Sequence, residues 1–228
     1  MKIKKAPRVL HSAALLSPPS GILHQMNWEQ EAAINLGIDW QVRMYCPKNS
    51  CENANVLVHD ADVDSEKIKS PLSKILAWFR LRRNYHRWLL QQQSNIDIFL
   101  LRYYVHDPFQ LNFLHLCKKP VYLVHHTLEV PELSLAGGVS GQVRSKLESL
   151  LARFAIPKAE GIIGVTNEIV NYELERSGIK KRKNHVYPNG IAWQDFDIMD
   201  NRTIKIPELL FVANFAPWHG LDLSLIHI

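Results

Sequence analysis

The sequence predicts an α/β fold built on a doubly wound parallel sheet that spans roughly residues 1 to 190. Short apolar runs with strand character alternate with segments of helical periodicity, which is typical of parallel sheets covered by helices on both faces. The composition agrees, because 46% hydrophobic and 21% charged residues in a chain of 228 suffice for a globular core. The strand-like runs lie at 8–14, 40–46, 97–102, 121–125, 161–165 and 184–187.

The helices between these runs are indicated by their end signals. A periodic segment at 23–36 stops at Gly37, a residue that tolerates the left-handed conformation in which many helices end. Asp107 is placed to cap the next helix and is followed by proline, which the first helical position accepts. Thr166 is placed to cap a third helix, which has an acidic residue in its first turn and a glycine at its exit.

The composition excludes several classes of protein. No run of about 18 apolar residues is available to span a bilayer, and polar residues interrupt the short apolar stretch near the N-terminus, so we expect neither a membrane span nor export. The three cysteines are an odd number without a second pair for a zinc site, so we expect ordinary reduced thiols in a cytoplasmic protein. These are Cys46, Cys51 and Cys117.

The positive charge of the chain is concentrated in one segment. The net charge is +5, yet 67–93 alone holds seven Lys or Arg residues and no Asp or Glu. Aromatic and leucine side chains recur there at spacings of three and four, so we expect an amphipathic helix with a cationic face. Such a helix either lies on an anionic membrane surface or packs on the core with its charged face solvated. No nucleic-acid-binding motif accompanies the charge, so we expect no nucleic acid partner.

Ligands of doubly wound sheets bind at the carboxyl ends of the strands, so the residues after each strand are the candidates for a site. After the first strand, Gly21 would let a ligand approach the backbone at the start of a helix. After the strand at 121–125, the sequence "VHHTLEVPE" brings two histidines and two glutamates to this edge. Because side chains alternate along a strand, only one of His125 and His126 should face the cleft.

A crossover between two domains is indicated by "HVYPNGIAWQDFD". Turn residues are followed there by a stretch without periodicity, and a new apolar strand follows at 209–213. We therefore expect a first domain over 1–200 and the beginning of a second domain over 201–228.

Three segments, "GIIGVTNEIVNYELERSGI", "NHVYPNGI" and "LLFVANFAPWHGLDL", together resemble a GT-B glycosyltransferase of the retaining family numbered four. The resemblance implies a Rossmann-like N-terminal domain that binds the acceptor and a truncated Rossmann-like second domain that binds the nucleotide sugar. It implies that His126, with His125 as the fallback, lies beside the transferred sugar. The positions implied for donor contacts are Gly21, Asn214, His219 and Gly220, and those for acceptor contacts are Arg102, Glu129 and Glu132. Asn214 and His219 stand where the family usually has Arg and Lys.

The resemblance also implies a reaction. A hexosyltransferase of this family moves a sugar from a nucleotide-diphosphate-sugar donor to a glycan or lipid-linked acceptor, as in cell-envelope polysaccharide synthesis, and needs neither a metal nor another cofactor. We expect it in the cytoplasm, peripheral at the inner face of the membrane through 67–93. There are two alternatives. One is a nucleotide-sugar epimerase of the same fold, and the other is a non-catalytic module that binds a membrane surface or a partner.

The last residues raise a separate expectation. A run such as "LLEA" is implied after "HGLDL", whereas the chain reads "SLIHI", which one frame of a common library adapter encodes. We expect the native sequence to end at Asp222 or Leu223, and the chain by itself to be inactive because it supplies one wall of the cleft. A naturally short protein or a frameshifted gene is the alternative.

Overall fold

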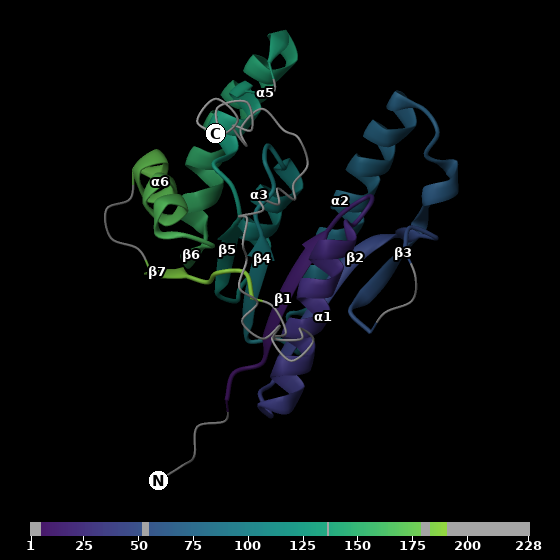
Figure 1. Ribbon diagram of the computed structural model, residues 1–228, viewed down its shortest axis with the longest axis vertical. Helices are drawn as coiled ribbons and strands as arrows, with labels where there is room; N and C mark the ends of the chain where they lie inside the picture. The colour runs from purple at the N-terminus through teal and green to yellow at the C-terminus, as the bar shows by residue number, and fades with distance from the viewer. Residues whose placement is uncertain (1–5, 52–54, 136, 179–182, 191–228) are drawn as a thin grey trace, which may run out of the picture.

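One sheet of seven parallel strands forms the centre of the protein, in the order β3-β2-β1-β4-β5-β6-β7 (Figure 1). The structure is a computed structural model that describes residues 6–51, 55–135, 137–178 and 183–190. The strand order reverses at β1, which confirms the predicted doubly wound α/β fold. The strands are β1 Val9–Ala14, β2 Trp40–Lys48, β3 Leu57–Asp64, β4 Ile98–Arg102, β5 Val121–His125, β6 Gly161–Gly164 and β7 Lys183–Val186.

Six strands lie within two residues of the predicted bounds, and β3 is the strand that the sequence analysis missed. Its sequence, "LVHDADVD", carries three aspartates and forms the outer edge of the sheet. Several of its side chains are exposed, because an edge strand needs fewer apolar residues than a central one. The strand predicted at 209–213 and the domain boundary near residue 200 lie outside the described residues.

The helix ends follow the predicted signals. Asp107 accepts a hydrogen bond from the backbone N–H of Phe109 at 2.9 Å, and Thr166 accepts one from that of Ile169. Gly178 ends its helix with φ of 69°, which a residue with a Cβ rarely adopts. The helices are α1 Ser20–Asn35, α2 Pro71–Gln92, α3 Pro108–Leu116, α4 Glu129–Leu135, α5 Gly138–Ala155 and α6 Asn167–Ser177, with short 3₁₀ turns at Ser65–Lys67 and Ile156–Lys158.

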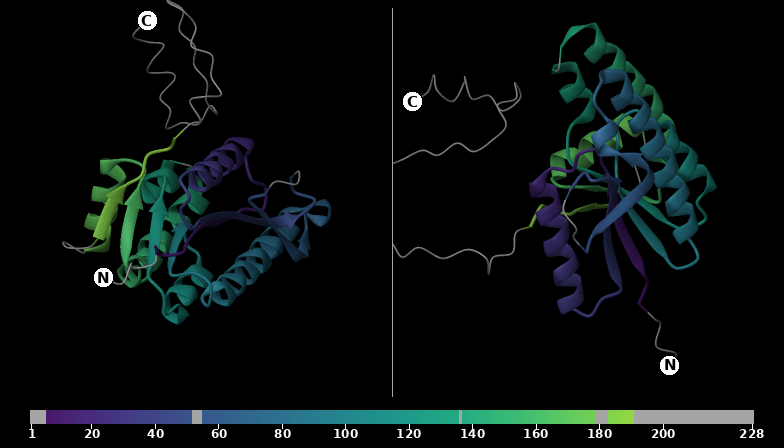
Figure 2. Two further views of the ribbon diagram at one scale, coloured as in Figure 1. Left: turned by 90° about the horizontal axis from the view of Figure 1, so that it is seen from below. Right: turned by 90° about the vertical axis from the view of Figure 1, so that its right-hand side faces the viewer.

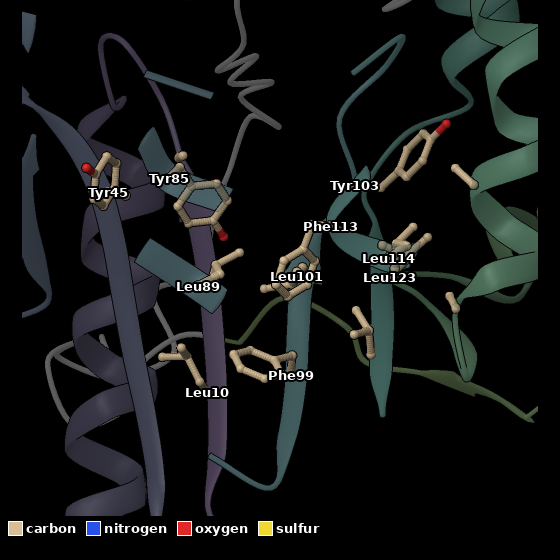
Figure 3. Packing of buried hydrophobic residues seen from close by; sticks show 14 of the residues in the cluster. Leu10, Tyr45, Tyr85, Leu89, Phe99, Leu101, Tyr103, Phe113, Leu114 and Leu123 are labelled. Atoms are coloured by element: carbon tan, nitrogen blue, oxygen red, sulfur yellow. The ribbon is translucent and has the colours of Figure 1, made fainter. Parts of the chain in front are cut away.

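The helices cover both faces of the sheet, as Figure 2 shows. α1 packs on one face, where Met26 contacts side chains of β1 and β2. α2, α3 and α5 pack on the other face and share one larger core with β1, β4 and β5. Figure 3 shows Leu10, Phe99 and Leu123 of these three neighbouring strands within this core. Burial of each such side chain contributes about 1.5–3 kcal/mol, so this layer fixes the carboxyl ends of β1, β4 and β5 relative to one another.

The segment at 67–93 is a helix only from Pro71, after a capping box between Ser70 and Ser73. Its C-terminal half is packed into the core, which agrees with the core-packed interpretation for that half. Arg82 is buried and donates to Asp107 at 2.7 Å, so it does not belong to the cationic face as predicted. Among the residues that the structure describes, no helix is long and apolar enough to cross a membrane.

Candidate functional site

A narrow cavity opens at the carboxyl edge of the sheet, between α1 and the strands β1, β4 and β5. The room inside it for the centre of a water molecule is about 20 Å³. Strands β1 and β4 pair in parallel, as do β4 and β5, so their carboxyl ends bring polar side chains distant in sequence to one place. The lining residues are His11, Ala13, Ile22, Gln25, Met26, Glu29, Arg102 and His126.

The two adjacent histidines after β5 have different environments. His126 lines the cavity together with Arg102. His125 is fully buried and stacks on Tyr103 with 4.4 Å between ring centroids. The structure therefore places His126, which the resemblance favoured, at the cavity, and His125, the fallback, in the core.

The charge state of His126 is set by its surroundings. Burial lowers the pKa of His126 to about 3, and the positive charge of Arg102 and the nearby His11 act in the same direction. At neutral pH this imidazole is uncharged, so one ring nitrogen can donate a hydrogen bond and the other can accept one. A neutral histidine of this kind suits contact with a sugar hydroxyl.

A second histidine, His11 of β1, forms a hydrogen-bonded dyad with Glu29 of α1. His11 Nδ1 lies 2.7 Å from Glu29 Oε1, and Trp40 Nε1 donates to the same carboxylate oxygen at 2.7 Å. The dyad orients the His11 ring and leaves Nε2 as the nitrogen that a ligand would meet. Sequence analysis did not select this dyad, although a histidine within a largely apolar central strand was a usable signal.

The predicted crossover loop lies beside the same cavity. Gln25, which lines it, donates from Nε2 to Asn189 Oδ1 at 2.8 Å. The "PNG" turn is therefore joined to α1 across 164 residues of sequence. This contact places the end of the described chain against the site.

Gly21 lies in the first turn of α1, exposed, with no atom within 4 Å of the position that a Cβ would occupy. The space next to the N-terminus of α1 is thus open, as a donor contact would require. The other donor-contact candidates, Asn214, His219 and Gly220, lie outside the described residues.

The acceptor-contact candidates separate into two places. Arg102 lines the cavity, whereas neither Glu129 nor Glu132 does. Glu129 is 5% exposed and is bound by Arg176, so its placement does not support an acceptor contact. Glu132 lies on α4 and is only partly exposed.

Behind His125 lies a buried charge cluster, defined by His125, Glu129, Glu148, Glu173 and Arg176. The guanidinium of Arg176 contacts Glu129 at 3.3 Å, Glu148 at 2.8 Å and Glu173 at 2.6 Å. Three carboxyl groups thus share one guanidinium. Burial, reinforced by the neighbouring carboxylate of Glu129, raises the pKa of Glu173 to about 8, against the opposing charge of Arg176.

Three residues of the cluster are close enough together to hold a metal ion. The ligand atoms of His125, Glu129 and Glu173 lie within 4.8 Å of one another. Arg176 already provides positive charge to both carboxylates. The cluster therefore has the form of an internal ion-pair network that connects β5, α4, α5 and α6.

The chain is similar to several solved structures. Sucrose-phosphate synthase from Thermosynechococcus elongatus is 12% identical, with 82% of this chain and 92% of that chain covered and a TM-score of 0.45. A UDP-glucosyltransferase from Polygonum tinctorium is 12% identical. The match covers 82% of this chain and 53% of that chain, with a TM-score of 0.46. MurG from Acinetobacter baumannii is 12% identical. The match covers 72% of this chain and 42% of that chain, with a TM-score of 0.37. The match spans about half, or less, of the length of the last two proteins.

These TM-scores are below 0.5, so the family assignment rests on sequence. No curated protein matches the chain. A family model described as Glycosyltransferase Family 4 matches residues 35–193, well over half of the chain, and includes Arg102, His125 and His126. This match confirms the resemblance found in the sequence. The chain therefore belongs to Glycosyltransferase Family 4.

Proposed function

We propose that the protein takes part in retaining transfer of a hexosyl group from a nucleotide-diphosphate-sugar donor to an acceptor bound at the carboxyl edge of the sheet. The observation that carries this proposal is the cavity in which His126, Arg102 and the His11–Glu29 dyad converge. Family membership supplies the reaction class, and the location agrees with the place where doubly wound sheets bind ligands. A second domain would supply the donor's nucleotide site.

In this reaction the bond between the anomeric carbon and the phosphate oxygen breaks, and the acceptor oxygen forms the new bond on the same face. The departing phosphate accepts the acceptor's proton, so the protein needs no strong base of its own. Positive charge develops on the sugar ring as the bond breaks, and fixed dipoles stabilise it better than mobile water does. His126 is suited to this role, because an uncharged imidazole can hydrogen-bond to the sugar without repelling the developing charge.

Arg102 and the His11–Glu29 dyad are suited to hold the acceptor. Arg102 is a permanent cation with a donor fork that fits a phosphate or carboxylate group. Glu29 is held by both His11 and Trp40, so its carboxylate orients the dyad. Such a pair can position an acceptor hydroxyl for attack.

We further propose that the acceptor is a glycan on a lipid carrier, assembled for the cell envelope at the cytoplasmic face of the membrane. The exposed cations of α2, which are Lys74, Arg80, Arg83 and Arg87, support contact with an anionic lipid surface. The described residues by themselves form one wall of the site, and we expect turnover only in the complete enzyme.

Transfer assays of the complete enzyme test this function. With a panel of UDP- and GDP-sugars and glycolipid acceptors, we expect one donor to yield product with retained anomeric configuration. His126→Ala should lower kcat by about 100-fold, as loss of a transition-state hydrogen bond does. His115→Ala, at an exposed histidine of α3, is the matched control and should leave kcat unchanged. Epimerisation of a nucleotide sugar without any acceptor would instead identify an epimerase.

A further inference from the structure

α5 carries an apolar stripe on the side that faces away from the core. Five large apolar side chains recur along it at spacings of four, four, three and four residues, which places them on one face of a helix. The buried residues of α5, such as Ser145, Glu148 and Ala152, lie on the opposite face. The stripe consists of Val139, Val143, Leu147, Leu150 and Phe154, which are 79%, 58%, 42%, 54% and 56% exposed.

The exposed charges of α5 are all positive. Arg144, Lys146 and Arg153 are exposed. Glu148, the one acidic residue of this helix, is fully buried in the charge cluster and bound by Arg176. The stripe is therefore flanked by cations that no carboxylate of the same helix opposes at the surface.

The first half of α2 has the same character. Leu72, Ile75, Leu76 and Phe79 are exposed, from 45% to 66%, and recur at helical spacing. Its exposed cations follow on the same helix, which contains no Asp or Glu. Trp78 lies half-buried beside Phe79, and an aromatic residue of this kind is typical of a membrane interface.

The two helices belong to one layer of the molecule. α3 contacts both α2 and α5, and all three helices contribute to the core on the same face of the sheet. Figures 1 and 2 show the N-terminal ends of α2 and α5 reaching past the sheet at the end where the candidate site lies. Both sets of exposed apolar residues therefore lie on helices of the same layer.

We infer that α5 and the first half of α2 together form a bilayer-binding surface, in which the stripe of α5 enters the acyl boundary of an anionic leaflet. Within the two helices themselves every exposed charge is positive, although Asp62 and Asp64 of β3 lie beside Leu76 and Arg80 of α2. Exposed apolar residues flanked by cations of the same helix favour an anionic lipid surface over a second copy of this chain, because two copies would bring these cations together. The inference extends the predicted contact of 67–93 to a second helix. It needs no catalysis and stands whether or not the proposed transfer reaction is correct.

Vesicle flotation of the whole chain tests the inference. We expect the chain to bind vesicles that contain about one third phosphatidylglycerol in phosphatidylcholine, and to bind pure phosphatidylcholine at least about tenfold more weakly. The double variant Leu147→Ser/Leu150→Ser should lower the partition coefficient on the mixed vesicles by about tenfold or more, because both side chains lose their apolar contact with lipid.

A matched control separates insertion from general loss of surface hydrophobicity. Leu36→Ser/Ile38→Ser removes two similarly exposed residues at the end of α1, on the other face of the sheet, and should leave binding unchanged. Lys146→Gln/Arg153→Gln should weaken binding to mixed vesicles only at low salt. Circular dichroism of each variant verifies that the helices are retained.

Three results would overturn the inference. The first is failure of the whole chain to bind the mixed vesicles. The second is binding that Leu147→Ser/Leu150→Ser leaves intact, which would indicate charge attraction alone. The third is a dimer in sedimentation that the same double variant dissociates, without an effect on vesicles, which would show that a second copy covers the stripe.

Discussion

Glu173→Gln should raise the free energy of unfolding at neutral and alkaline pH relative to the wild type. In acid the two proteins should differ little. Glu173 is fully buried, with Glu129, Glu148 and His125 close to it around the single guanidinium of Arg176. Burial raises the pKa of its carboxyl group from the ordinary 4.5 to about 8. The folded state therefore keeps the proton up to about pH 8, whereas the unfolded chain releases it near pH 4.5.

The size of the effect follows from this difference. Between pH 4.5 and about 8 the folded state holds one proton more than the unfolded state, so this group's contribution to stability falls as the pH rises. The slope is about 1.4 kcal/mol per pH unit for one proton. Glutamine cannot ionise and still offers an oxygen to Arg176. The difference in free energy of unfolding, variant minus wild type, should thus grow by about 2–3 kcal/mol between pH 5 and pH 7.5, with partial solvation of the cluster reducing it.

Urea unfolding of both proteins at half-unit steps of pH measures this difference directly. Titrating groups outside the cluster contribute nearly equally to both proteins and cancel in the difference. Glu175→Gln removes an exposed carboxylate from the same helix and is the matched control, for which we expect a flat difference. A Glu173→Gln difference that is also flat would show that Glu173 is ionised in the folded protein, and the reasoning would be wrong.

Three further outcomes follow from the same structure. Arg176→Met should destabilise the protein by about 3–5 kcal/mol in urea unfolding, because it leaves buried carboxylates unpaired, and a loss below about 1 kcal/mol would contradict this. Gly161→Ala should cost about 1–3 kcal/mol, since a Cβ there would lie 2.6 Å from the carbonyl oxygen of Lys183 and from the ring of Tyr122; an unchanged thermal midpoint would refute the crowding. Burial lowers the pKa of His126 to about 3, so stability should fall as the pH drops from 6.5 towards 3. His126→Gln should reduce that fall, and equal acid sensitivity of both proteins would contradict it.

Much of the fold could be predicted from the sequence because the local signals and the tertiary structure agree. Buried parallel strands appear as short apolar runs, and Asp107 and Thr166 form the caps that their positions indicated. The edge strand β3 was missed because its three aspartates, of which Asp60 is buried, hide the apolar strand pattern. Arg82 was assigned to the cationic face of the helix, since nothing local shows that Asp107, 25 residues later, would pair with it in the core.

The site was only partly predictable. The alternation of side chains along β5 shows that His125 and His126 face opposite ways, but the neighbouring elements decide which of them meets a cavity. The His11–Glu29 dyad joins a strand to the helix after it, and pairing of this kind depends on how α1 packs on β1. Glu129 was expected near a ligand, whereas Arg176 of α6 holds it in the core. Contacts between distant segments thus account for each of these residues.

The measurement that tests the central claim most directly is NMR of the histidine imidazoles in the whole chain, during titration with nucleotide sugars and candidate acceptor glycans. The account predicts that at least one ligand shifts the signals of His126 and His11 together and saturably, while the signal of buried His125 moves far less. His126→Ala should weaken that binding, and His115→Ala should not. Ligand binding that leaves His126 and His11 unperturbed would contradict the assignment of this cavity as the sugar site.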